Sequence, residues 1–149
     1  MSPLSVVVRF ARLAPAERSI LVRAGLLAVA CEAALRCEPF PRVARRFGVR
    51  LTGEPSRRPS PTVNAPELAR ARWATDAIFR RWPVQGTCLR RSLVLGRLLR
   101  EYEPVVRIGV ARRGAEIGAH AWLEVAGLTI DEGPDELAPL RFAARHGSG

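Results

Sequence analysis

Three residue types that together can cleave or transfer an acyl group occur in separate segments of this 149-residue chain. Cys88 begins a predicted helix, His120 lies inside a predicted strand, and Asp131 lies in the strand that follows. A thiol at a helix N-terminus meets unpaired backbone N–H groups and the positive end of the helix dipole, which favour the thiolate. An imidazole can accept and return the thiol proton, and a carboxylate can fix the tautomer of that imidazole. The three residues therefore predict nucleophilic acyl transfer, with Cys88 as the nucleophile, His120 as the base and Asp131 as the third member.

The identity of the acid depends on the register of a predicted hairpin. If the loop consists of the two residues 126–127, Trp122 pairs with Asp131, which then lies diagonally across from His120 on the same face. A three-residue loop would place Glu132 opposite Trp122 instead. We expect Asp131 to be the acid, and Glu132 is the alternative that the sequence leaves open.

Other residues near the predicted dyad could take part in binding. Strand alternation places His120, Trp122 and Glu124 on one face of the sheet. The residues on the other face are expected to form part of the core: Ala119, Ala121, Leu123 and Val125. Trp122 could line a substrate cleft or pack against the sheet, and Glu124 could tune His120 or pair with an arginine such as Arg91. Gln85, in the loop before the nucleophile helix, could help bind an oxyanion or could be a solvated loop residue.

The other cysteines and the second histidine are interpreted as structural or non-functional. Cys31 and Cys37 lie in and at the end of a predicted N-terminal helix with no histidine nearby in sequence, and His146 lies close to the last residue. Three cysteines without a C-x-x-C spacing predict neither a disulfide framework nor a zinc ribbon, and no metal or cofactor is implied. Cys88 itself could be a small buried apolar residue instead of a nucleophile. A reducing, cytoplasmic location fits this cysteine usage best.

The elements that must position these residues form an α+β domain. We expect a single domain in which residues 1–47 are helical, 48–64 form a proline-rich loop and 65–140 form the catalytic core. In the core, helices precede an antiparallel meander, and the nucleophile helix packs on that antiparallel sheet. The expected core elements are helices over 66–82 and 88–102 and strands over 105–111, 119–125 and 128–131.

The long N-terminal helix is expected to bury one face. Pro15 suits its first turn, and Glu17 lies near the positive end of its dipole. Apolar residues recur at three- and four-residue spacing over 20–35. Arg23 and Glu32 interrupt this stretch, so it is too short and too charged to span a membrane. The helix could nevertheless leave a surface that docks another protein or the face of a membrane.

The charge of the chain is a weak clue to its function. All 24 basic residues are arginine, against 14 acidic residues, which gives a net charge of +10. Such an excess would suit a nucleic-acid-binding protein. The arginines are scattered through every segment, however, and those of the nucleophile helix are expected mostly to face water: Arg90, Arg91, Arg97 and Arg100. Nucleic-acid binding is therefore an alternative that we do not favour, and no nucleic-acid partner is expected.

Two motifs in the core resemble those of a known family. Cys-Leu-x-Arg-Ser-Leu, at 88–93, and His-Ala-Trp-x-Glu, at 120–124, are similar to motifs of the transglutaminase-like cysteine peptidases that remove the leader from lasso peptide precursors. The similarity covers about residues 66–131. It implies a transglutaminase- or papain-like core in which Cys88 is the nucleophile, His120 the base and Asp131 the third member.

The same resemblance implies partners. We expect the chain, which starts with helices, to lack the leader-recognition domain that some relatives carry, so a separate recognition protein would deliver the precursor. The resemblance assigns the ATP-consuming cyclisation of the freed core peptide to an asparagine-synthetase-like cyclase, and no phosphate-binding GxxxxGK[ST] loop occurs here. Within the enzyme class, the alternative is a different acyl transfer on the same scaffold, by a transglutaminase or a general peptidase.

Overall fold

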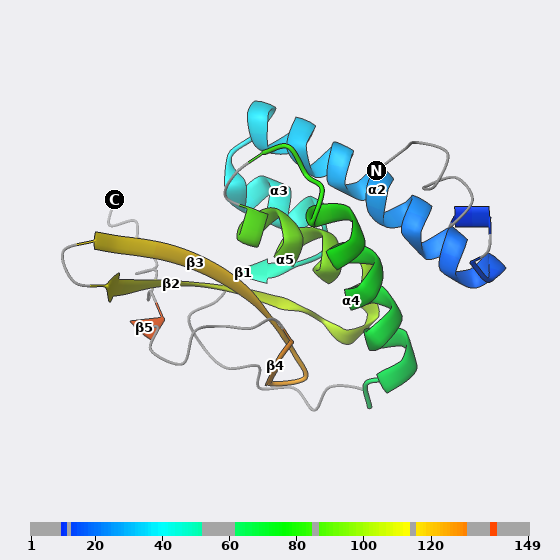
Figure 1. Cartoon of the computed structure of the whole chain (residues 1–149). Helices are drawn as coiled ribbons and strands as arrows, with labels where there is room; N and C mark the ends of the chain where they lie inside the picture. Colours follow the sequence, from blue (N-terminus) through cyan, green and yellow to red (C-terminus); the bar gives the residue numbers. More distant parts are fainter. Residues whose placement is uncertain are drawn as a thin grey trace.

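Helices form one layer and a five-stranded sheet forms the other in the computed structural model of the chain (Figure 1). The structure describes residues 10–11, 13–51, 62–84, 87–113, 116–130 and 138–139. The elements in chain order are α2 (Pro15–Cys37), α3 (Phe40–Arg46), β1 (Arg50–Leu51), α4 (Ala65–Phe79), α5 (Thr87–Leu98), the 3-10 helix η1 (Arg100–Tyr102), β2 (Val105–Arg113), β3 (Glu116–Val125), β4 (Leu128–Thr129) and β5 (Ala138–Pro139). The predicted α+β class is confirmed, because the helices precede most of the strands and pack on them as a separate layer.

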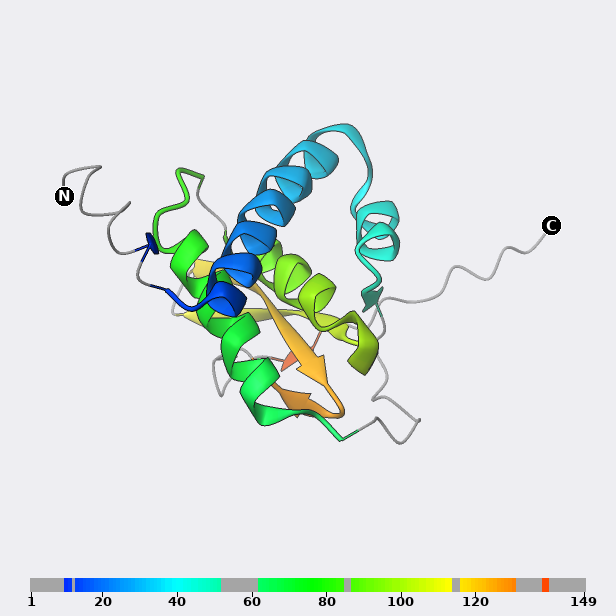
Figure 2. The same ribbon diagram turned by 90° about the vertical axis from the view of Figure 1, so that its right-hand side faces the viewer.

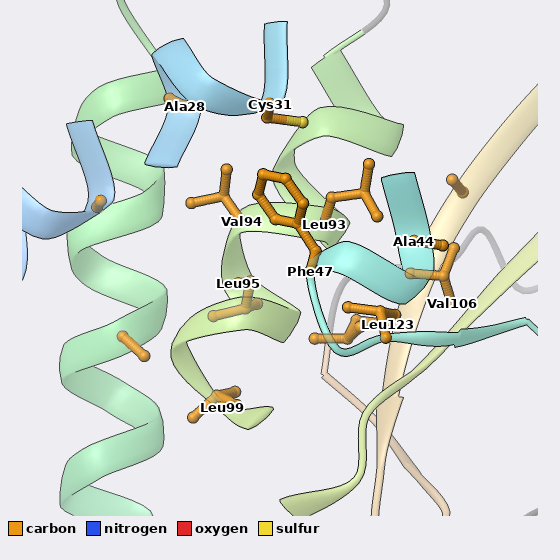
Figure 3. Packing of buried hydrophobic residues seen from close by; sticks show 14 of the residues in the cluster. Ala28, Cys31, Ala44, Phe47, Leu93, Val94, Leu95, Leu99, Val106 and Leu123 are labelled. Carbon is orange, nitrogen blue, oxygen red and sulfur yellow. The ribbon is translucent and has the colours of Figure 1, made fainter. Parts of the chain in front are cut away.

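Helix α5 is the central element of the fold. It contacts α2, α4, β2 and β3, and Figure 2 shows α2 and α4 on the side of α5 that faces away from the sheet. Its buried leucines and valine occupy the middle of the core in Figure 3, and residues from four other segments surround them. These surrounding residues are Ala28 and Cys31 of α2, Ala44 of α3, Phe47 directly after α3, Val106 of β2 and Leu123 of β3. The helix that carries the predicted nucleophile is therefore packed on both sides.

Helix α2 begins and packs as the sequence predicts. The Ala14 backbone N–H donates a hydrogen bond to Glu17 Oε2 at 3.0 Å, and Pro15 occupies the first turn, where its missing N–H costs nothing. The buried residues of α2 recur at three- and four-residue spacing: Ala24, Ala28, Cys31 and Ala34. No helix in the described part of the chain is long and apolar enough to cross a membrane.

Helix α4 is shorter than predicted and packs on the core mainly through small residues. It ends at Phe79, whereas the sequence predicted a helix that continues to Trp82. Trp73, a large apolar residue of this helix, is exposed. The buried face of α4 carries mostly small residues: Ala71, Ala74, Thr75 and Phe79. Small side chains let α4 approach α2 and α5 closely. The side of α4 that is buried is therefore determined more by side-chain size than by hydrophobicity.

The sheet is mixed, which corrects the prediction of an antiparallel sheet. β1 lies inside the predicted loop over 48–64 and pairs parallel with β2, so that Arg50 lies opposite Val105. β2 and β3 form a long antiparallel pair, β4 extends the sheet beyond β3, and β5 pairs antiparallel with β2. Strands of two residues leave no alternating pattern in a sequence, which is why neither β1 nor β5 was predicted.

The loop between β3 and β4 has the predicted length of two residues. Val125 pairs with Leu128, and the two residues between them, Ala126 and Gly127, have positive φ angles of 56° and 77°. Two consecutive positive φ angles are typical of a type I′ turn, whose twist matches that of the strands it joins. The predicted core face of β3 is confirmed at Ala121, Leu123 and Val125, which are buried, but Ala119 near the start of the strand is exposed.

Gly96 lets α5 approach the sheet. A Cβ atom at this position would lie only 2.7 Å from Val49 Cγ2 and 3.2 Å from Leu123 Cδ1. We therefore expect Gly96→Ala to lower the free energy of unfolding by about 1–3 kcal/mol, measured by urea denaturation. Gly25→Ala is the matched control in α2, because its Cβ would meet only Ile78 Cδ1 at 3.5 Å. Alanine also favours a helix, so this control should raise stability by up to about 1 kcal/mol. Equal effects of the two substitutions would contradict the steric explanation.

Candidate active site

Cys88 lies in the first turn of α5, as the sequence predicts. Its thiol is free and half-buried, and it packs against the edge of the hydrophobic core. Cys31 differs, because it is fully buried and burial raises the pKa of its thiol to about 12, against the opposing effect of Arg90. A thiol with so high a pKa stays protonated, which agrees with a structural role. Cys37 is exposed at the end of α2.

Strand β3 carries His120 on the face of the sheet opposite to the core face. The cross-strand neighbour of His120 is Gly109, which has no side chain to cover the imidazole ring. The ring of Trp122 lies nearly parallel to it, at an interplanar angle of 15° and a centroid distance of 6.5 Å. His120 Nε2 is buried and has no hydrogen-bond partner among the residues that the structure describes. Because buried polar atoms in folded proteins are nearly always paired, this unpaired ring nitrogen makes His120 a candidate for binding a ligand, although Trp82 Nε1 is unpaired in the same way.

Trp122 and Glu124, the other residues predicted beside His120, make contacts within the fold. Trp122 is only 8% exposed, which favours packing over the lining of an open cleft. Glu124 Oε2 accepts a hydrogen bond from Arg107 Nε at 2.9 Å, in an ion pair that is largely buried. Arg107 lies directly opposite Trp122 on β2. The arginine that binds Glu124 therefore comes from the neighbouring strand, and it is not Arg91.

Two consecutive arginines fasten the first turns of α5 to the outer helices. Arg90 Nε donates to Glu32 Oε2 of α2 at 2.5 Å, and Arg91 Nη2 lies 2.7 Å from Asp76 Oδ1 of α4. All four side chains are less than half exposed. The prediction that these arginines face water is therefore wrong, although Arg100 at the other end of the helical segment is exposed. The carboxylates of Glu32 and Asp76 lie within reach of these arginines because α2 and α4 pack against α5. The sequence of α5 alone does not reveal these partners.

Ser92 connects α5 to strand β3 through a hydrogen bond. Its hydroxyl, which is fully buried, donates to the backbone oxygen of Ala121 at 3.4 Å. Two residues further along β3, the oxygen of Leu123 accepts from the N–H of Ile130 after β4. Carbonyl groups two residues apart point to the same side of a strand, so Ser92 lies at the edge of β3 that β4 leaves uncovered.

The same contacts give the direction of α5 along β3. Ser92 binds the strand at Ala121. Gly96, one helical turn later, lies close to Leu123, which is two residues further along the strand. Four helical residues and two strand residues span almost the same length, so the helix and the strand run side by side in one direction. Cys88, one turn before Ser92, therefore lies toward the start of β3, at the level of His120 along the strand. The helix packs on the core face of the sheet, whereas strand alternation turns the His120 side chain to the other face.

No hydrogen bond joins the Cys88 thiol to His120 within the described residues, so their catalytic pairing stays a prediction. Catalytic hydrogen bonds are often long in substrate-free enzymes and shorten when substrate binds. The predicted oxyanion residue Gln85 lies outside the residues that the structure describes. In the described part of the chain, no group of three or more His, Cys, Asp or Glu residues could hold a metal ion.

The third member of the predicted triad also lies outside the described residues, as does its alternative, Glu132. The register that leads up to it is described, because the N–H of Ile130 donates to the oxygen of Leu123 at 2.8 Å. This is the register in which a continued pairing would place Asp131 opposite Trp122. The two-residue loop that favoured Asp131 is thus present, and the assignment of the acid stays a prediction.

Sequence reasoning missed the role of Ser92, which connects the nucleophile helix to the histidine strand. One signal was present, because Ser92 follows Cys88 by four residues and so lies on the same face of the helix. A serine within a run of leucines must also find a partner when it is buried. The identity of that partner, the oxygen of Ala121, depends on the packing of the helix on the sheet.

Comparison with known families agrees with this arrangement. The family model described as the transglutaminase-like superfamily matches residues 33–144, which is most of the chain. The chain therefore belongs to the transglutaminase-like superfamily, and its fold and its half-buried thiol are compatible with a cysteine peptidase or an acyl transferase. A search of curated proteins and a search of solved structures found no match.

The ion pair between Arg90 and Glu32 should make stability depend on pH. The hydrogen bond from Arg90 lowers the pKa of Glu32 below its ordinary value, and Arg36 adds to this effect. A carboxyl with a lower pKa in the folded chain stabilises the fold above its unfolded pKa, and this stabilisation is lost as pH falls through the folded pKa. We therefore expect the unfolding temperature of the wild type to fall more steeply between about pH 5 and about pH 3 than that of Glu32→Gln, measured by circular dichroism.

The control for this measurement is Glu38→Gln. Glu38 pairs with Arg46 near the end of the same helix, where the arginine is mostly exposed. This control should keep the wild-type dependence on pH, because exposed ion pairs contribute little to stability. Identical slopes for wild type and Glu32→Gln would show that the pair does not stabilise the fold.

Proposed function

We propose that this chain is a cysteine peptidase that removes the leader peptide from a lasso peptide precursor. Membership of the transglutaminase-like superfamily supports a thiol-dependent reaction at an acyl group. The observation that carries the proposal is the buried, unpaired Nε2 of His120, on the strand along which the helix of Cys88 runs. The motifs at 88–93 and 120–124 support the lasso leader peptidase subtype.

The first half-reaction forms a thioester. His120 takes the proton of the Cys88 thiol, and the thiolate attacks the carbonyl carbon at the junction of leader and core peptide. The oxyanion accepts hydrogen bonds from the backbone N–H of Cys88 and from a second donor, for which Gln85 is our candidate. The C–N bond then breaks, His120 gives its proton to the amine of the core peptide, and the leader stays bound to the sulfur.

The second half-reaction releases the leader. Water attacks the thioester carbon while His120 accepts a proton from that water molecule. The C–S bond breaks, the sulfur regains a proton from His120, and the leader leaves with a free carboxylate. Asp131 is our candidate for the group that orients the imidazole through both steps, as the carboxylate does in related triads.

This function requires partners of a definite kind. The substrate is a precursor peptide whose leader would be bound and delivered by a separate recognition protein. An asparagine-synthetase-like cyclase would use the freed amine of the core peptide to close the ring. We propose that the reaction takes place in the cytoplasm, where the thiol of Cys88 stays reduced.

A different acyl transfer is the main alternative, since the superfamily is compatible with both hydrolysis and transfer. The two reactions differ in the acceptor that attacks the thioester, which is water in a peptidase and an amine in a transferase. Nucleic-acid binding is the weaker alternative. Arg90, Arg91 and Arg107 are engaged with carboxylates of the fold, so the excess of arginine overstates the positive charge that this part of the surface offers to phosphates.

Cleavage of the precursor should depend on Cys88 and on no other cysteine. We expect Cys88→Ala to abolish leader release from a lasso precursor in the presence of its recognition protein, because no other nucleophile would lie beside His120. Mass spectrometry of the products would measure the loss. Cys37→Ser, which changes the exposed cysteine of α2, is the matched control and should keep wild-type activity. Full activity of Cys88→Ala would overturn the proposed mechanism.

Paired substitutions should identify the acid. We expect Asp131→Asn to lower kcat by a factor of about 10³–10⁴, because the imidazole would lose the carboxylate that fixes its tautomer. Glu132→Gln should leave kcat within about threefold of the wild type, since the observed register would turn this residue to the other face. The opposite ranking in single-turnover measurements would show that the chain slips by one residue after β4.

A further inference from the structure

The outward side of α2 is apolar, and no element in the described part of the chain covers it. Val22, Leu26 and Val29 are 49%, 68% and 61% exposed. Together with Ala33 they follow spacings of four, three and four residues, which place them on one stripe of the helix. We call these four residues the outer face of α2. The opposite side of the helix is buried in the core, and a helix that is apolar on both sides is typically buried on both sides.

A groove extends the outer face toward α3. It has a volume of about 510 Å³ and lies between α2, α3 and the last part of α5. Its walls are mostly apolar and include Leu27, Ala30, Ala33 and Phe47. Figure 1 shows α2 along the outside of the molecule, with α3 beside its C-terminal end. A stripe of apolar residues beside a groove is the kind of surface that accepts the apolar side of another helix.

Arginines border this surface on more than one side. Arg18 and Arg23 line a shallow hollow with Val22 and Leu26, and Arg97 borders the groove. The whole chain carries a net charge of +10. Charges beside an apolar contact mainly select the partner and its orientation, so the surface favours an acidic partner over a neutral or basic one.

We propose that the outer face of α2 and the adjoining groove bind an acidic amphipathic helix of a partner protein. A second copy of the chain fits less well, because it would bring the arginines of both copies together. The outer face, from Val22 to Ala33, is about 18 Å long and about 10 Å wide. It offers about 180 Å², well below the roughly 800 Å² per partner of a stable interface, so with the groove it suits one docked helix better than a dimer. A flat membrane surface would leave the groove unfilled.

The test measures binding of a helical probe to the full chain. The probe is a labelled synthetic peptide of about three heptads, with leucine at the a and d positions and glutamate at the positions beside them. A second peptide carries lysine in place of glutamate. We expect fluorescence anisotropy to show salt-sensitive binding of the acidic peptide and no binding of the basic one. Because binding needs no catalysis, the result is independent of the proposed peptidase function.

Two leucine substitutions locate the binding surface. Leu26→Glu should weaken binding of the acidic peptide at least about tenfold, because it places a charge in the centre of the outer face. Leu128→Glu is the matched control, since Leu128 is 63% exposed on β4, away from α2. This control should leave the affinity unchanged, and neither substitution should change the unfolding temperature by more than a few degrees.

Five results would overturn the proposal. Equal binding of the acidic and basic peptides, or equal losses in Leu26→Glu and Leu128→Glu, would exclude a specific acidic ligand on α2. A dimer in light scattering that Leu26→Glu dissociates would assign the outer face to a second copy. Binding to phosphatidylglycerol vesicles without binding to the peptide would assign it to a membrane. A large fall in the unfolding temperature of Leu26→Glu would show that another part of this chain covers the surface.

Discussion

The attachment of α5 to three different elements is the constraint on which the candidate site depends. Arg90, Arg91 and Ser92 follow the predicted nucleophile within one turn, and each binds a group of a different neighbour, α2, α4 or β3. A single buried ion pair contributes little net stability, since its desolvation offsets much of its Coulomb attraction. Its geometric effect is larger, because removal of one partner leaves a charge without compensation. The three contacts therefore hold the start of α5, which carries Cys88, against α2, α4 and β3.

The face of the sheet that carries His120 is organised by polar contacts instead of by leucines and valines. Arg107 lies opposite Trp122 on the neighbouring strand and binds Glu124. On this face, a largely buried ion pair therefore connects β2 and β3 in addition to their backbone hydrogen bonds. The ring of Trp122 in turn lies against that of His120. This arrangement limits the orientations open to the imidazole, and within the described part of the chain Nε2 of His120 has no hydrogen-bond partner. A base that must accept a proton from a substrate complex needs both properties.

The parts of this fold that were predictable from the sequence are those that local patterns determine. The three- and four-residue spacing of Ala24, Ala28 and Cys31 identified the buried side of α2, and Ala126-Gly127 identified a two-residue turn and its register. Neither the short strand β1 nor the partners of the arginines could be found in this way. A two-residue strand has no period, and an arginine on a helix gives no sign of whether a carboxylate lies within reach in another element. The proximity of Cys88 and the start of β3 likewise arises from packing, through Ser92 and Gly96.

The apolar residues of α2 lie on two sides of the helix, and the spacing in the sequence identified only the residues of the inward side. The inward side carries the small residues Ala24, Ala28 and Ala34, which allow close packing against α4 and α5. Larger apolar residues lie on both sides, because Leu21 and Leu27 pack partly buried against the core whereas Leu26 is exposed. Hydrophobic periodicity detects an apolar side by its contrast with a polar one, and this contrast is weak in a helix that is apolar on both sides. Exposed large apolar side chains add nothing to the stability of the isolated fold. Their burial can stabilise only a complex in which a partner covers them. Packing within the chain thus accounts for the alanines of α2 but not for its outward valines and leucine.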